Sequence, residues 1–72
     1  MSSVHTNDYR RFLLRLKEAR LAAHLTQAQV SKKLRRPQSF VSKCESGERR
    51  VDVTELKVFA ALYKKPLAFF AD

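Results

Sequence analysis

The chain has 72 residues, a formal net charge of +8 and 44% hydrophobic residues. A chain this short forms one small domain, in which only about 60% of the unfolded surface can be buried, so a deep substrate pocket is not expected. The hydrophobic fraction excludes a disordered tail. The positive charge favours a polyanionic partner, meaning DNA, RNA or an acidic lipid surface.

Several other classes of protein are disfavoured. No apolar run approaches the roughly 18–20 residues of a membrane-spanning helix, and residues 1–8 lack the basic and apolar regions of a signal peptide. The single cysteine, Cys44, is expected to be a small core residue, and no Cys/His spacing indicates a zinc site. No nucleophile–base set or phosphate-binding glycine loop indicates an enzyme. We therefore expect a cytoplasmic, non-enzymatic protein that binds no membrane, metal, cofactor or small-molecule ligand.

One glycine and two prolines favour helices over a turn-rich β protein, and we predict five helices. The first covers residues 9–23, follows a flexible arm of residues 1–8, and has Asn7 or Asp8 as its N-terminal cap. Apolar residues recur along it at helical spacing: Phe12, Leu16, Ala19 and Ala23.

The second and fourth helices carry the same start signal. Thr26 with Gln29, and Asp52 with Glu55, have the spacing of a capping box. In this motif each side chain bonds the backbone N–H of the other residue. The second helix is expected to end at residues 34–35.

The third helix is expected over residues 37–46. Pro37 suits its first position, where a missing N–H is harmless, and Gly47 suits the left-handed residue that follows a helix. The fourth helix continues through Tyr63, and Pro66 opens a last helical turn. The sequence therefore predicts a compact all-α bundle with helix-turn-helix organisation.

Much of this chain resembles the Cro/C1-type (Xre-like) helix-turn-helix regulators of bacteria and their phages. The matching pieces are Leu25-Thr-Gln27, Leu34, Gln38-Ser-Phe-Val-Ser-Lys43, Glu45-Ser-Gly47, Ala60 and Pro66-Leu-Ala-Phe-Phe70. The resemblance implies a lambda-repressor-like five-helix domain over residues 9–72, with the helix at about residues 37–46 in the major groove of double-stranded DNA. It implies a sequence-specific transcription regulator. Because nothing in the chain looks like an effector domain, repression by promoter occlusion is the default mechanism.

The resemblance also implies roles for single residues. Base-reading positions fall on Gln38, Ser39, Ser42 and Lys43. Positions that hold the DNA backbone fall on Gln27, Ser46, Arg49 and Arg50. Arg20 and Glu45 match a structural ion pair that joins the first helix to the third.

The residue types agree with these roles but leave alternatives open. Gln38 has the two groups needed to bond adenine bidentately, or it is a solvated residue at a helix start. Ser39 and Ser42 are small enough to let the backbone approach a groove, although serine is also common on surfaces. Lys43 suits a phosphate better than a base, because arginine is the better bidentate reader. Phe40, taken as an exposed aromatic, is expected to contact a thymine methyl, with packing against the second helix as the alternative.

The positive charge is concentrated near the third helix. Seven of the fifteen basic residues lie between residues 32 and 50, against two acidic residues. Arg35 and Arg36 precede this helix, and Arg49 and Arg50 follow it. Their position favours phosphate binding over a merely solvated basic face.

At two helix ends the sequence departs from the resembled family, which usually has glycine in place of His24 and Arg35. A positive φ is unfavourable for a residue with a bulky side chain. We expect Arg35 either to adopt the left-handed conformation or to let the second helix end differently.

Four apolar residues lie outside the expected core: Val58, Ala61, Leu62 and Phe69. A two-fold homodimer would bury them and place two reading helices about 34 Å apart, which is one turn of DNA. Alternatively, they close the base of the bundle or pack on a C-terminal extension. A different functional class remains open, in which this face binds a protein partner, as in an antitoxin-like module or the DNA-binding portion of a longer regulator.

Overall fold

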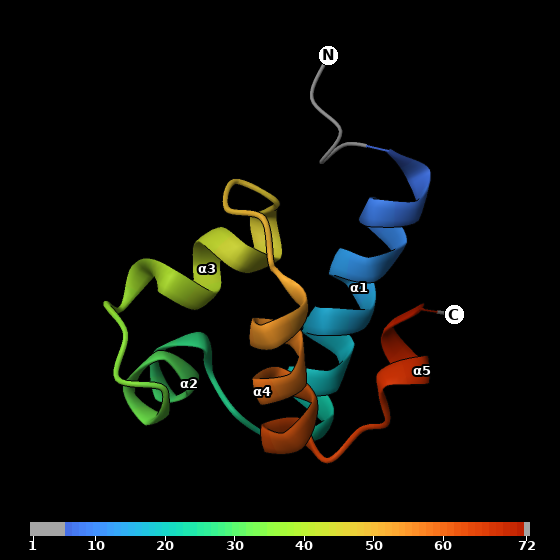
Figure 1. Cartoon of the computed structure of the whole chain (residues 1–72). Coiled ribbons are helices and arrows are strands. Elements are labelled where there is room, and N and C mark those ends of the chain that lie inside the picture. Colours follow the sequence, from blue (N-terminus) through green and yellow to red (C-terminus); the bar gives the residue numbers. More distant parts are fainter. Residues whose placement is uncertain (1–5, 72) are drawn as a thin grey trace.

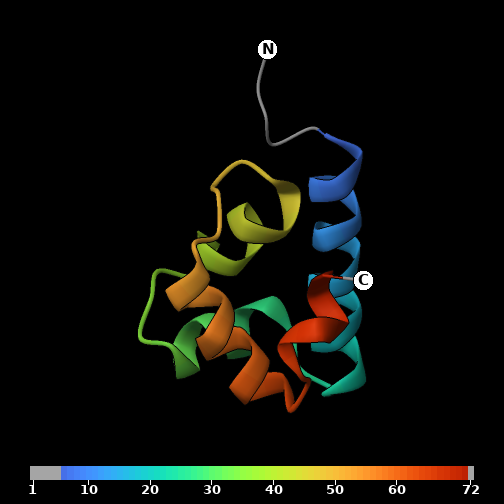
Figure 2. The same cartoon turned by 45° about the vertical axis from the view of Figure 1, so that its right-hand side comes forward.

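The structure, a computed structural model, describes residues 6–71, and this part of the chain forms five α-helices and no strand. The helices are α1 (Asn7–Ala22), α2 (Gln27–Lys33), α3 (Ser39–Ser46), α4 (Val53–Tyr63) and α5 (Leu67–Ala71). Helix α5 lies beside α1 on one side of the bundle, α4 runs through the middle, and α2 and α3 form the other side (Figures 1 and 2). The predicted all-α bundle of five helices is confirmed.

Helix α1 begins two residues earlier than predicted, at Asn7. Its cap is Thr6, whose side-chain oxygen accepts a hydrogen bond from the Tyr9 N–H at 3.2 Å. The prediction of Asn7 or Asp8 as the cap was wrong, because both residues already belong to the helix. The last part of the predicted arm is therefore helical, and residues 1–5 of that arm lie outside the described residues.

Both predicted capping boxes are confirmed. Thr26 and Gln29 exchange hydrogen bonds of 3.0 and 2.8 Å at the start of α2. Asp52 and Glu55 do the same at 2.7 and 3.1 Å at the start of α4. Each box satisfies two backbone groups that a helix start leaves unpaired, so local sequence fixes where these two helices begin.

Helix α3 begins later than predicted. Pro37 lies two residues before its first residue, and Gln38 occupies the cap position with φ −55° and ψ −33°. The Phe40 N–H donates to the Pro37 carbonyl at 2.9 Å, a three-residue spacing that makes a tight turn before the α-helical ladder starts. The end was predicted correctly, since Gly47 follows the helix with φ 84°.

Phe40 belongs to the core, so the expectation of an exposed aromatic was wrong. The residue is only 7% exposed, and its ring stacks on Phe59 of α4, with ring centroids 6.2 Å apart. Phe59 stacks in turn on Tyr63 at 5.8 Å. Because Phe40 packs on α4, it leaves little surface for a thymine methyl.

Four helix ends are followed by a residue in the left-handed conformation, and only Gly47 among these is glycine. The others are His24, Arg35 and Lys64, with φ of 60°, 57° and 57°. Of the two alternatives stated for Arg35, the left-handed backbone is the one observed. Because a side chain at positive φ costs roughly 1–2 kcal/mol, the chain carries strain at three of its turns.

Replacing Arg35 by glycine should therefore raise the free energy of unfolding by about 0.5–1 kcal/mol, since glycine adopts this conformation freely but loses more entropy on folding. The measurement is the urea midpoint followed by circular dichroism. Arg35→Ala is the matched control, because it removes the same charge and keeps the strained Cβ. An equal gain in both variants would attribute the effect to charge repulsion and contradict backbone strain.

Candidate nucleic-acid interface

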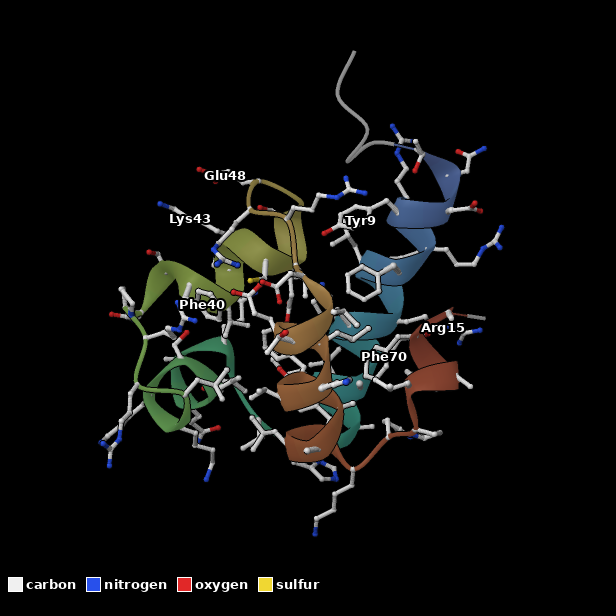
Figure 3. All side chains as sticks on the ribbon, viewed as in Figure 1. Tyr9, Arg15, Phe40, Lys43, Glu48 and Phe70 are labelled. Atoms are coloured by element: carbon white, nitrogen blue, oxygen red, sulfur yellow. The ribbon has the colours of Figure 1, made fainter. Side chains whose placement is uncertain are left out.

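Helix α3 has one buried and one exposed face. Val41 and Cys44 are fully buried with Phe40 against the other helices. The opposite face carries four exposed residues, which we call the reading face: Gln38, Ser39, Ser42 and Lys43. Lys43 points away from the rest of the domain in Figure 3. The predicted base-reading residues, Phe40 excepted, thus share one accessible surface.

The start of α2 lies next to this reading face. Thr26, Gln27 and Ala28 line an open hollow of about 500 Å³ together with Gln38, Ser39 and Ser42. Residues of two helices therefore border one concave, polar surface. Such a surface suits the edge of a nucleic-acid groove, where backbone and base atoms lie close together.

The ion pair predicted between Arg20 and Glu45 is formed, and it joins α1 to α3. Arg20 Nε donates to Glu45 Oε2 at 2.6 Å and Nη2 to Oε1 at 3.1 Å, while Nη1 donates to the Leu25 carbonyl at 2.9 Å. Both charged side chains are almost entirely buried. The hydrogen bonds to Glu45 raise the pKa of the Arg20 guanidinium, so Arg20 keeps its charge.

Gln27 has a structural partner that the sequence did not reveal. Its Nε2 donates to Glu45 Oε1 at 3.0 Å, which ties the first residue of α2 to α3. The side-chain amide predicted to hold a phosphate is thus already engaged on its nitrogen. The ion pair and Gln27 together fix the position of α2 and α3 relative to α1.

Ser31 of α2 supplies the missing cap of α3. Gln38 makes no side-chain capping bond, but the Ser31 hydroxyl accepts from the Val41 N–H and donates to the Gln38 carbonyl, both at 3.3 Å. Val41 is the third residue of α3, the position that a cap normally satisfies. A buried serine on one helix therefore sets the start of the next, and this role was missed from the sequence.

Two further buried groups titrate abnormally. Burial raises the pKa of the Cys44 thiol, which keeps it protonated and agrees with its expected core role. Burial and the nearby Glu45 carboxylate raise the pKa of the Tyr63 hydroxyl, which has no hydrogen-bond partner. Neither group faces the reading surface.

The residues predicted to bind phosphate differ in what else they contact. Arg35 is exposed. Arg50 lies over the Tyr9 ring, 4.4 Å from its centroid. Ser46 donates to the Lys43 carbonyl at 3.1 Å and accepts from the Glu48 N–H at 3.2 Å, so its hydroxyl closes the end of α3.

The other two arginines meet at Glu55. Arg49 donates to its two carboxylate oxygens at 2.9 and 2.6 Å, and Arg36 lies 3.8 Å from one of them. The hydrogen bonds from Arg49 lower the pKa of Glu55, and they raise the pKa of Arg49 in return. The sequence showed Glu55 only as a capping residue.

A family model described as a helix-turn-helix domain matches residues 11–68. The chain belongs to the helix-turn-helix domain family. Comparison with curated proteins and with solved structures gave no match. In a helix-turn-helix domain the second helix of the motif is the one that enters the DNA groove, and here α3 has that place.

The predicted dimer face of this helix-turn-helix domain is only partly apolar surface. Val58 is 46% exposed, and Ala61 is also exposed. Leu62 is half-buried, and Phe69 lies beneath two cations, with Arg15 and Lys65 at 5.2 and 4.9 Å from its ring centroid. The four residues therefore do not form one bare apolar patch.

Within residues 6–71 no helix has the length and apolar character to cross a membrane. The same part of the domain holds no group of three or more His, Cys, Asp or Glu side chains placed to bind a metal ion.

Proposed function

We propose that this helix-turn-helix domain is a sequence-specific regulator of transcription, of the Cro/C1 (Xre-like) type, that binds double-stranded DNA. In this proposal α3 lies in the major groove, and the reading face contacts base edges. The observation that carries it is the division of α3: every apolar residue is buried, and the accessible face holds only small or hydrogen-bonding side chains. Binding at a promoter would repress transcription by excluding polymerase.

Affinity would come mainly from contacts to the phosphates of the DNA backbone. We propose Arg35, Arg36 and Arg50 as the principal phosphate contacts, because they border α3. Gln27, Ser46 and Arg49 are further candidates, and their side chains also make hydrogen bonds within the domain.

We also propose that two copies bind one operator, in contact through the exposed part of α4 around Val58 and Ala61. A two-fold pair would place two α3 helices about 34 Å apart, which matches successive major grooves on one side of DNA. Light scattering over a range of concentrations, with and without DNA, measures this directly. A monomer under both conditions would contradict the pairing and leave DNA binding in place.

The function is tested by selecting bound sequences from random double-stranded DNA. We expect an enriched motif with two related half-sites whose centres are about 10 base pairs apart. Recovered sequences indistinguishable from the input would overturn sequence-specific recognition.

Replacing Arg36 by glutamine should weaken binding to all DNA alike and reduce the slope of log affinity against log salt by about one, because one phosphate contact is lost. The measurement is fluorescence anisotropy at several salt concentrations. Lys64→Gln, at the far end of α4, removes the same charge away from α3 and should leave the slope unchanged. Equal slopes for Arg36→Gln and wild type would remove Arg36 from the phosphate contacts.

A further inference from the structure

Glu55 connects three segments that surround the start of α3. It lies in the first turn of α4, accepts two hydrogen bonds from Arg49 of the loop after α3, and attracts Arg36 of the turn before α3. Its side chain is only 13% exposed. A single carboxylate therefore joins both ends of the recognition helix to α4.

Both arginines also lie against Phe40. The guanidinium carbons of Arg36 and Arg49 are 4.6 and 4.9 Å from its ring centroid, a distance at which a cation is attracted to an aromatic ring. Phe40 is the second residue of α3 and stacks on Phe59 of α4. We call Arg36, Phe40, Arg49 and Glu55 the Glu55 cluster.

The cluster holds its two arginines unequally. Arg49 makes the short bidentate pair, and a third bond of 3.3 Å to the Arg50 carbonyl occupies it further. Arg36 approaches the same carboxylate only to 3.8 Å, and nearly half of its side chain is exposed. Arg49 is thus committed to the fold, whereas Arg36 is oriented on Phe40 and accessible to a phosphate.

Side chains do not completely fill the space beside the Glu55 cluster. A hollow of about 150 Å³ lies beside it, lined by Leu34, Arg36, Phe40, Glu55, Val58 and Phe59. Beside this hollow the charged contacts to Glu55 add to the Ser31 hydrogen bonds and the Phe40 stacking that hold the start of α3.

We propose that Glu55 determines DNA sequence specificity without touching DNA, because its bidentate pair holds Arg49 on Phe40 and so fixes the orientation of the reading face relative to α4. This inference rests on the proposed function. Base contacts depend on hydrogen-bond geometry, whereas phosphate attraction tolerates displacement. Releasing the cluster therefore reduces preference for the cognate sequence more than it reduces overall affinity.

The test is Glu55→Gln in the whole chain. Glutamine keeps an oxygen for the capping box at Asp52, but it turns an amide N–H₂ toward Arg49 and removes the charge. We expect the ratio of affinities for selected and random DNA to fall about tenfold, while affinity for random DNA is retained. Glu48→Gln is the matched control, because Glu48 is exposed in the loop after α3, next to Arg49, and points outward (Figure 3). It makes the same charge change and should keep the wild-type ratio.

A second variant keeps the test decisive if Glu55→Gln does not fold. Arg49→Lys preserves net charge but cannot form the two-pronged pair, and it should lower the same ratio. Residual dipolar couplings without DNA should show a changed angle between α3 and α4 in either variant and none in Glu48→Gln.

Three results would overturn the inference. If folded Glu55→Gln has the same ratio of affinities for selected and random DNA as wild type, Glu55 does not determine specificity. The proposed function still stands in that case, because the wild-type protein prefers the selected sequence. If Glu55→Gln loses affinity for selected and random DNA equally, Glu55 contributes to stability only. A wild-type protein without preference for any sequence overturns the proposed function itself, and the specificity role with it.

Discussion

Replacing Glu45 by alanine should lower the free energy of unfolding by about 3–5 kcal/mol, the largest loss that we expect from one substitution in this domain. The change strands the guanidinium of Arg20, a residue that is only 6% exposed, and leaves the Leu25 carbonyl as its remaining hydrogen-bond partner. It also removes the acceptor of Gln27. A domain of this size has a total stability of roughly 4–11 kcal/mol, so a large fraction of the variant should be unfolded.

Urea denaturation followed by circular dichroism measures this loss. Glu18→Ala is the matched control, because Glu18 pairs with Arg15 at 3.2 Å on the surface of α1, where an ion pair contributes little. The double change Arg20→Met with Glu45→Leu should recover most of the stability, since apolar residues of similar size often replace a buried pair without loss. Equal small effects of Glu45→Ala and Glu18→Ala would show that the buried pair does not hold α1 to α3.

The predictions from sequence succeeded where a feature depends on residues close together in the chain. Thr26 with Gln29 and Asp52 with Glu55 are three residues apart, so the capping boxes and the starts of α2 and α4 could be read directly. Gly47 marked the end of α3 for the same reason. The Arg20–Glu45 pair is 25 residues apart, and only the family resemblance pointed to it.

The start of α3 could not be predicted locally, because its cap comes from another helix. Pro37 and Gln38 gave a plausible helix start by sequence rules. Once the Ser31 hydroxyl binds the Val41 N–H, no capping side chain is needed at position 38. The Gln38 side chain therefore makes no capping hydrogen bond.

The environment of Phe40 was equally hidden. Val41 and Cys44 mark the apolar side of α3, and Phe40 lies at the border of that side, so its neighbours in sequence do not decide its direction. The direction of the Phe40 side chain is set by Phe59, on which it stacks, and by the two arginines that cover its ring. For the same reason Glu55 was visible as a capping residue but not as the acceptor of Arg49.

Replacing Gln38 by alanine should lower affinity for the selected DNA about 5- to 150-fold, which corresponds to about 1–3 kcal/mol for one bidentate base contact. Affinity for random DNA should be nearly unchanged. The structure makes this variant a clean test, because the Gln38 side chain is exposed and makes no capping bond. Its backbone carbonyl, which accepts from Ser31, is present in alanine as well.

The measurement is binding to a set of duplexes that carry each single base change in the selected site. Loss of one contact should flatten the preference at one position per half-site and leave the others as in wild type. Arg36→Gln provides the contrast, since it should weaken every duplex equally. If Gln38→Ala also weakened every duplex equally, Gln38 would contact the DNA backbone. Base reading would then have to come from the remaining three residues of the reading face.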